Sequence, residues 1–167
     1  MNSDSEKRKT MYRELLQSAN SNLRFFAGKL CDDITNGEEF VEGISDFIEK
    51  GGILEIILNQ YDEDLIKSSN LYKRLAFYSA QNYAVSVMTT SMTVTISIQD
   101  QDTPAHFAVA DQMAYRLEID IEKRNAICNM NDEALAQKLI DIFTHISSNS
   151  QTQIVDLVKL FSLKAKE

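Results

Sequence analysis

Side chains that can bind a substrate or act on it are concentrated in residues 105–120, which read AHFAVADQMAYRLEID. The candidate binding face combines an imidazole, a guanidinium and three carboxylates: His106, Asp111, Arg116, Glu118 and Asp120. A guanidinium suits an anionic ligand. Together with an imidazole and a carboxylate it also suits an enzyme that acts on a phosphoester. This segment therefore contains the candidate functional site.

The same segment predicts two short strands joined by a turn at Asp111–Gln112. Successive side chains of a strand point to opposite faces, so Arg116, Glu118 and Asp120 share one face of the second strand. If the two strands pair as a hairpin, His106 approaches Glu118 or Asp120 across the ladder. The alternative interpretation is a solvated strand face with a surface ion pair, and the sequence leaves both open.

The usual catalytic signatures are absent from the sequence. The only other histidine, His145, falls on the polar side of a predicted helix, so His106 has no second histidine to work with. There is no serine in a nucleophile-elbow context, no glycine-rich phosphate loop and no His-Glu-x-x-His motif. Cys31 and Cys128 lack C-x-x-C spacing, which predicts buried free thiols. No cofactor and no metal ion are expected.

Composition and charge narrow the class of protein. The 167 residues, 44% of them hydrophobic, suffice for one compact domain with its own core. The net charge of -8 argues against a nucleic-acid partner, because a phosphate binder needs a basic face. No apolar run reaches the roughly 18 residues of a membrane span, and the polar N-terminus lacks the apolar core of a signal peptide. A cytoplasmic protein is expected.

The first half of the chain predicts helices alternating with strands. Its predicted elements are an amphipathic helix at 4–19, a strand at 22–27, a helix at 38–50, a strand at 53–58, a helix at 62–78 interrupted near 68–70, and a strand at 83–88. The first helix should pack on the domain or on a second copy. Residues 1–20 are therefore assigned to an N-terminal helix, and residues 21–167 to a single α/β domain.

The second half predicts a run of strands followed by helices. Its predicted elements are a strand at 92–98, a turn at 100–104, the strand pair of 105–120, a strand at 125–128, a helix from 131–133 to 147, and a helix at 151–163. This order predicts a three-layer α/β fold, with a mixed sheet of about seven strands flanked by helices.

The order of elements, together with residues 105–133, resembles one half of the phospholipase D superfamily fold. In that family a strand bearing H-x-K-x-x-x-x-D is followed by a strand bearing G-S-x-x-N, and later by N-x-E before the final helix. With Asp111 as the motif aspartate, Ala110-Asp111-Gln112 matches the usual apolar-Asp-turn, and Asn131-Asp132-Glu133 matches N-x-E. The resemblance covers roughly residues 20–148.

Under this alignment the residues that carry catalysis in the family are replaced. Pro104 stands at the catalytic histidine and His106 at the lysine. The glycine and serine positions fall on Glu118 and Ile119, and the asparagine position falls on Glu122. The resemblance therefore implies a degenerate member without the nucleophile that forms a phospho-enzyme, and hence without phosphodiesterase activity.

The resemblance also implies a partner, because family members with one half per chain often pair. The favoured function is a non-catalytic, homodimeric binding or regulatory module, in which Arg116 and Glu118 of two copies line a shared cleft. One alternative is a phosphoesterase-like enzyme using His106, Arg116 and Glu118. The other is an assembly subunit that binds another protein through its outer helices. A small anionic ligand or another protein is the expected partner besides a second copy.

Overall fold

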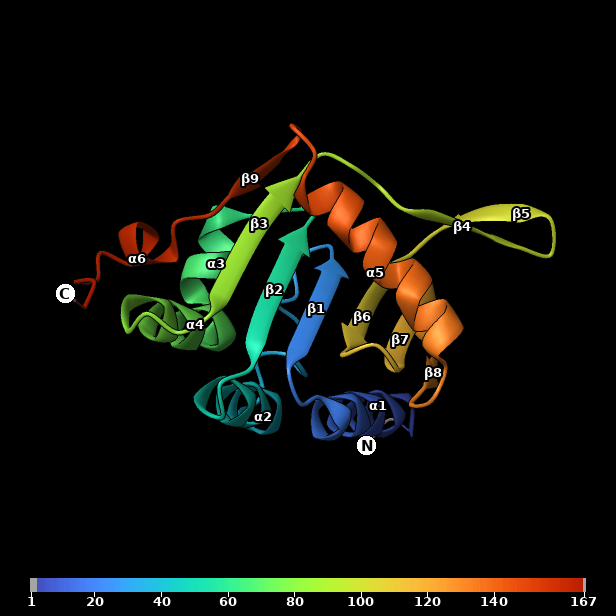
Figure 1. Cartoon of the computed structure of the whole chain (residues 1–167), viewed down its shortest axis with the longest axis horizontal. Coiled ribbons are helices and arrows are strands. Elements are labelled where there is room, and N and C mark those ends of the chain that lie inside the picture. The colour runs from blue at the N-terminus through green and yellow to red at the C-terminus, as the bar shows by residue number, and fades with distance from the viewer. Residues whose placement is uncertain (1–2, 167) are drawn as a thin grey trace.

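A computed structural model describes residues 3–166 as a mixed sheet with helices on both faces (Figure 1). The sheet contains seven strands: β1 (Asn22–Ala27), β2 (Ile53–Leu58), β3 (Val85–Thr90), β6 (His106–Ala110), β7 (Ala114–Asp120), β8 (Asn125–Asn129) and β9 (Thr152–Ile154). Their order across the sheet is β8-β7-β6-β1-β2-β3-β9. β2 pairs in parallel with β1 and with β3, and the other neighbours are antiparallel. The predicted fold class is confirmed.

The helices cover the two faces of the sheet unequally. They are α1 (Ser3–Ser18), α2 (Glu38–Glu49), α3 (Glu63–Ser68), α4 (Asn70–Ala80), α5 (Glu133–Ser147) and α6 (Leu157–Leu160). Side chains of every helix except α5 enter one core cluster, and α5 alone supplies the helical part of the other. In β1, Phe25 points into the first cluster and Phe26 into the second, as the alternation of a strand buried on both faces requires. No helix within residues 3–166 is long and apolar enough to cross a membrane.

The predicted interruption near residue 69 separates α3 from α4. Ser69 is extended, with φ -80° and ψ 129°, and its hydroxyl accepts a hydrogen bond from the backbone N–H of Tyr72. A serine that caps the first turn of the following helix ends the preceding one. The break turns the chain so that Leu71, Tyr72 and Leu75 of α4 are fully buried against the sheet.

A separate two-stranded hairpin, β4 (Thr95–Ile98) with β5 (Gln101–Pro104), projects from the body (Figure 1). The expected turn at 100–104 is wrong, because residues 101–104 form a strand. The chain reverses at Gln99 and Asp100, whose φ angles of 49° and 61° are those of a tight hairpin turn. Pro104 is tolerated at the end of β5 because an unpaired edge needs no N–H donor there.

The expected helix at 151–163 is also wrong. Residues 152–154 form β9, which pairs with β3 at the sheet edge and leaves Ile154 79% exposed. The side chain of Asp156 then accepts from the backbone N–H of Lys159 and caps the single turn of α6. The apolar spacing of Ile154, Val155 and Val158 matches a helix, but the edge of β3 offers backbone partners that take part of this segment into the sheet.

Candidate functional site

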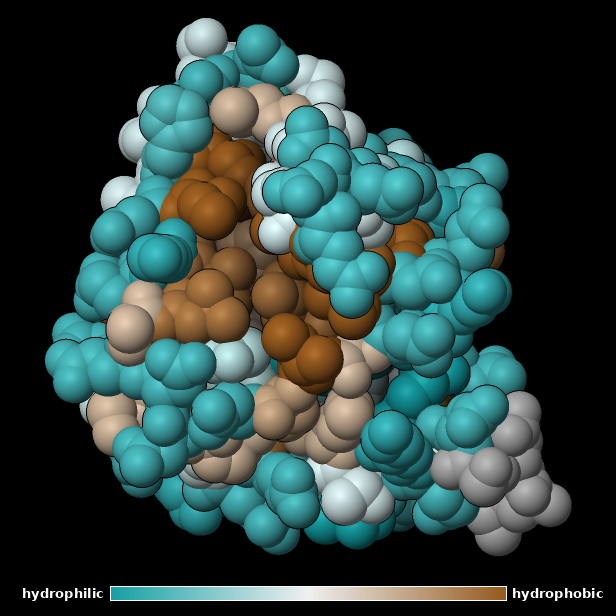
Figure 2. All heavy atoms as spheres, turned by 90° about the vertical axis from the view of Figure 1, so that its right-hand side faces the viewer, coloured by the Kyte–Doolittle hydropathy of each residue, from teal (hydrophilic) through white to brown (hydrophobic). Residues whose placement is uncertain are grey.

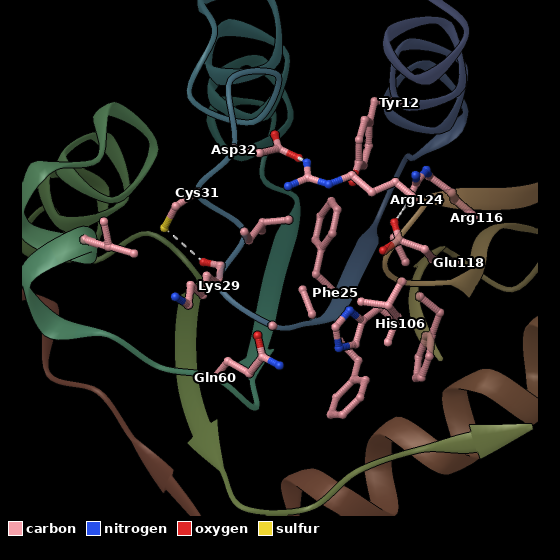
Figure 3. A pocket seen from close by; sticks show the side chains of 18 residues that line it. Tyr12, Phe25, Lys29, Cys31, Asp32, Gln60, His106, Arg116, Glu118 and Arg124 are labelled. Carbon is pink, nitrogen blue, oxygen red and sulfur yellow. Dashed lines mark hydrogen bonds and ion pairs between the residues drawn. The ribbon is translucent and has the colours of Figure 1, made fainter. Parts of the chain in front are cut away.

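A pocket of about 250 Å³ lies where β1 ends, beside β6 and β7 (Figure 3). Its polar lining comes from six segments: Lys29, Cys31 and Asp32 after β1, Gln60 after β2, His106 on β6, Arg116 and Glu118 on β7, Arg124 after β7, and Tyr12 on α1. Its apolar lining includes Phe25, Phe26 and Phe107. In open α/β sheets, ligands bind outside the carboxyl ends of strands where the chain order changes, which is the situation of β1 here.

Three of the predicted site residues lie together in this pocket. His106 is the register partner of Glu118, and Nη1 of Arg116 donates to Oε2 of Glu118 over 3.0 Å. Arg116 is only 4% exposed, so a solvated strand face does not describe this arrangement.

The other two candidates, Asp111 and Asp120, lie outside the pocket lining. Asp111 follows the far end of β6, where its carboxylate accepts from the backbone N–H groups of Asn20, Ser21 and Asn22. Asp120 accepts from the N–H of Lys123 in the turn between β7 and β8. Within this structure both carboxylates serve the backbone, and a ligand role for either stays a prediction.

Two arginines bond to Asp32 at the rim of the pocket, and the sequence alone did not predict this pairing. Arg124 pairs with Oδ2 of Asp32, and Arg8 of α1 donates to the same oxygen over 2.7 Å. Figure 3 shows the side chain of Arg124 extending across the pocket towards Asp32. The one sequence signal that could have suggested this is the position of Asp32 just after the first parallel strand.

Arg116 is the buried centre of this charge cluster. Its Cζ lies 4.6 Å from the ring centroid of Tyr12, a cation–π contact made by α1. Its Nε and Nη2 are buried, and no acceptor within residues 3–166 bonds to either atom. Leaving a buried donor unpaired costs about 1–3 kcal/mol, more for a charged group. Two such donors on one guanidinium fit the side-on recognition of a carboxylate or phosphate.

The electrostatics of the pocket favour an anion. Its lining contains three cationic side chains (Lys29, Arg116, Arg124) and two acidic ones (Asp32, Glu118), which gives one net positive charge in a chain of net charge -8. Burial tends to raise the pKa of Asp32. The N–H of Thr35 and the charges of Arg8 and Arg124 outweigh it, so the pKa of Asp32 lies below its ordinary value. Asp32 is therefore ionised at neutral pH and orders the arginines around the pocket.

The groups that could act in chemistry are neutral. Burial lowers the pKa of His106, and the charge of Glu118 opposes this only in part, so the imidazole is uncharged at pH 7. Burial, then the charge of Asp32, raises the pKa of Cys31 to about 11, which keeps the thiol protonated and a poor nucleophile. Within residues 3–166, no three His, Cys, Asp or Glu side chains are grouped so that they could hold a metal ion.

Two positions of the resemblance lie away from the pocket. Pro104, at the position of the catalytic histidine, is exposed at the end of β5 in the projecting hairpin. Ile119, at the serine position, packs against the core cluster on the α5 side, whereas Arg116 and Glu118 face α1 and the pocket. His106, at the lysine position, lies in the pocket.

No family model matches the sequence, and no curated protein is similar to it in sequence. Solved structures are similar in fold. An archaeal chromatin protein, TrmBL2, described as showing a novel mode of DNA binding, matches with a TM-score of 0.53 and 13% identity over 84% of this chain and 46% of its own. The phosphatidylserine synthase of Haemophilus influenzae Rd KW20 matches with a TM-score of 0.56 and 11% identity over 88% of this chain and 36% of its own.

This chain thus spans less than half the length of each of these neighbours. At such identities the similarity concerns the fold alone. The seven-stranded sheet with its flanking helices is the fold that this chain shares with the synthase, a neighbour with a phospholipase D-like fold.

Proposed function

We propose that this chain is a non-catalytic, phospholipase D-like binding module, cytoplasmic and homodimeric, whose pocket around Arg116 binds a small anionic ligand. One observation carries the proposal: a guanidinium 4% exposed lines the pocket while two of its nitrogens lack an acceptor. A carboxylate or phosphate that displaces the cover over these two buried nitrogens would supply that acceptor. The surplus of positive charge in the lining adds to the attraction.

The size of the pocket limits the ligand. Its volume of about 250 Å³ is below the roughly 300–1,000 Å³ of sites for drug-sized molecules. The three phenylalanine rings around it suit a small apolar or ring-shaped part, and Gln60 offers a further polar contact. A small organic carboxylate or phosphate fits these dimensions.

The contacts of α1 support a regulatory role for the module. Tyr12 lies over Arg116, and Arg8 bonds to Asp32, so two residues of this helix contact pocket residues directly. A ligand that binds Arg116 or breaks the ion pair of Arg124 with Asp32 would alter the contacts that Tyr12 and Arg8 of α1 make with Arg116 and Asp32. Ligand binding would thereby change how tightly the N-terminal helix α1 packs on the sheet.

A second candidate is the phosphoesterase-like enzyme. The structure brings His106, Arg116 and Glu118 into one pocket, and a neutral imidazole is able to accept a proton. Against it, the thiol of Cys31 is protonated and the family's nucleophile position is occupied by the exposed Pro104. Binding without turnover is the simpler function for this pocket.

Nucleic acid is a weaker candidate despite the DNA-binding neighbour. The positive charge here is confined to a small pocket, whereas phosphate-backbone binding uses an extended basic surface. Because the net charge of the chain is -8, we expect a short DNA duplex not to bind tightly.

Titration calorimetry with inorganic phosphate, sulfate and acetate tests the proposal. At least one of these anions should bind saturably to the wild-type chain, and Arg116→Gln should weaken that binding at least about tenfold, the effect of losing one charge-assisted hydrogen bond. Arg74→Gln is the matched control, since Arg74 also pairs with a glutamate, Glu42, but lies outside the pocket. Arg124→Gln removes a 45% exposed pocket cation and serves as second variant if Arg116→Gln does not fold.

Each of the following results would count against the proposal. One is a wild-type chain that binds none of the three anions. Another is binding that both pocket variants leave unchanged. The third is turnover of a chromogenic phosphodiester that His106→Ala abolishes, which would establish the enzyme candidate instead. A short DNA duplex belongs in the same series, and tight binding to it would count against the small-anion assignment.

A further inference from the structure

One side of the molecule exposes an apolar surface that the chain leaves partly uncovered. Figure 2 shows a hollowed brown area on the side that carries the β4–β5 hairpin and α5. Four large, partly buried side chains that pack against the second core cluster, together with the exposed Ile127, define this apolar hollow: Ile96, Ile119, Leu135 and Ile142. They come from β4, β7, β8 and α5.

Strand register explains why this surface is open. Ile127 of β8 is the partner of Leu117 of β7, and Leu117 belongs to the cluster that α5 covers. Ile119, at the register irregularity between Glu118 and Asp120 of β7, packs against the same cluster. Within residues 3–166, α5 is the one helix whose side chains enter this cluster, and Ile127 on the outermost strand remains 45% exposed beside it.

The β4–β5 hairpin carries the matching apolar side chains. Ile96 opposes Thr103 and Ile98 opposes Gln101, so both isoleucines lie on one face, while Thr95 and Ser97 are exposed on the other. The base of the hairpin is fixed where Val94 is buried and its carbonyl accepts from the N–H of Ala105. Ile96 packs against the second cluster. Ile98, nearer the tip, is not among the residues that pack against it.

We propose that the apolar hollow and the hairpin form a symmetric interface between two copies of this chain, with each hairpin lying over the hollow of the other copy. The inference deepens the homodimer of the proposed function by naming its surface. A projecting arm and a hollow on the same chain are self-complementary, which is the requirement for a two-fold interface. An isolated two-stranded hairpin is at best marginally stable in water, so a partner surface stabilises the arm as well.

Charged side chains beside the two surfaces favour a second copy as the occupant. The ionisable side chains of the hairpin are Asp100 and Asp102, both exposed. On α5, the exposed Lys138 follows Leu135 by three residues and precedes Ile142 by four, so it borders the hollow on the same side of the helix. The two-fold axis repeats the arm-in-hollow contact, which helps to reach the roughly 800 Å² per partner that a stable dimer needs.

In this arrangement the two pockets stay separate. Arg116 is covered by Tyr12 of its own α1, and Arg116 and Glu118 lie on the face of the sheet away from the hollow. A dimer of this geometry would therefore not form the expected cleft lined by both residues from two copies, and that cleft stays a prediction of the resemblance.

Sedimentation velocity at micromolar concentrations tests the interface. The wild type should sediment with twice the 19.0 kDa mass of one chain. Ile98→Asp in the hairpin and Ile127→Asp in the hollow should each raise the dimer dissociation constant at least about 30-fold, as at an interface hot spot. Phe77→Asp is the control, because Phe77 is 53% exposed on α4, outside both surfaces. Both interface positions are exposed or half-buried, and circular dichroism verifies that the variants fold.

Mixing the two interface variants separates this geometry from other dimers. Each variant alone has no intact contact, whereas the mixed pair retains one unmodified hairpin over one unmodified hollow. A dimer should therefore reappear in the mixture and in neither variant alone. Monomers at every wild-type concentration, dimers insensitive to both substitutions, or no recovery on mixing would each overturn the proposal.

Anion binding distinguishes failure of this interface from failure of the proposed ligand function. Ile98→Asp and Ile127→Asp lie outside the pocket, so they should bind an anion found for the wild type with unchanged affinity. Arg116→Gln should lose that anion while retaining the dimer. A wild type that is monomeric but still binds the anion would contradict the interface and would still support the binding pocket.

Discussion

Phe26→Ala is expected to lower the free energy of unfolding by about 3–5 kcal/mol. Phe26 is fully buried at the centre of the sheet. Its ring stacks on Phe107 at 5.6 Å between centroids and meets His106 edge-on at 5.8 Å. Truncation removes these contacts and leaves a cavity that neighbouring β1 and β6 residues cannot fill, because both strands are held by backbone ladders. Urea denaturation followed by circular dichroism measures the loss.

Two controls make this result specific. Phe26→Leu keeps most of the volume and should cost less than half as much. Phe77→Ala removes an exposed ring on α4 and should change the stability by no more than about 0.5 kcal/mol. Since Phe26 also lines the pocket, Phe26→Ala should weaken anion binding even where the chain is folded. A loss of stability below about 1 kcal/mol would contradict this account of the core.

Asp111→Ala is expected to cost about 2–3 kcal/mol. The carboxylate accepts three backbone N–H groups, from Asn20 and Ser21 over 2.8 Å and from Asn22 over 2.9 Å, and so fixes the entry into β1. A hydrogen bond to a charged group contributes about 1.5–3 kcal/mol to stability. The φ of 52° at Asp111 adds to the penalty, because alanine adopts this region less readily than aspartate.

The pH dependence of this contribution has a definite sign. Burial opposes ionisation of Asp111, but the N–H groups of Asn22, Asn20 and Ser21 and the charge of Arg24 outweigh it, so its pKa in the folded chain lies below the ordinary value. A depressed folded pKa means that the stability is present above the unfolded pKa of about 3.9 and is lost as the pH falls through the folded pKa.

Asp111→Asn is the matched variant for this prediction. Asparagine tolerates the positive φ and keeps one acceptor oxygen. At neutral pH the unfolding free energy of Asp111→Asn should therefore lie between those of the wild type and Asp111→Ala. The difference in unfolding free energy between wild type and Asp111→Asn should narrow as the pH is lowered from 7 towards 3. A difference that stays constant over this range would show that the charge of Asp111 is not what the backbone groups recognise.

Local patterns predicted most of the elements. Strands β1 and β2 follow the expected ranges because ILEIIL and NLRFFA are short apolar runs bounded by turn residues. The stripe of Leu139, Phe143 and Ile146 predicted α5 correctly. Prediction failed at 101–104, where a polar segment pairs with the adjacent β4 across a tight turn. It also failed at 152–154, where an ambiguous segment becomes a strand because the distant edge of β3 supplies its hydrogen bonds.

The candidate site was predictable only in part for a related reason. His106 and Glu118 face each other because a short hairpin fixes their register, and alternation alone reveals that pairing. Asp32 and Arg124 are 92 residues apart, and Arg8 comes from the N-terminal helix. No spacing rule connects such residues, since their contact depends on the whole sheet order and on the packing of α1. Burial of Arg116 likewise follows from tertiary packing.

The order of strands also bears on how fast the chain reaches its native state. β6, β7 and β8 follow one another through short turns. By contrast, β1 pairs with β6, which is distant in sequence, as the pairing of Leu23 with Ala110 shows. Pairing of distant segments slows folding, because the entropy of closing long loops is lost before the contacts form. The β6–β8 meander is thus placed to form early and to offer β6 as a template, with β1 joining later. Folding rates of variants in the β6–β7 turn and in β1 would report this sequence of events.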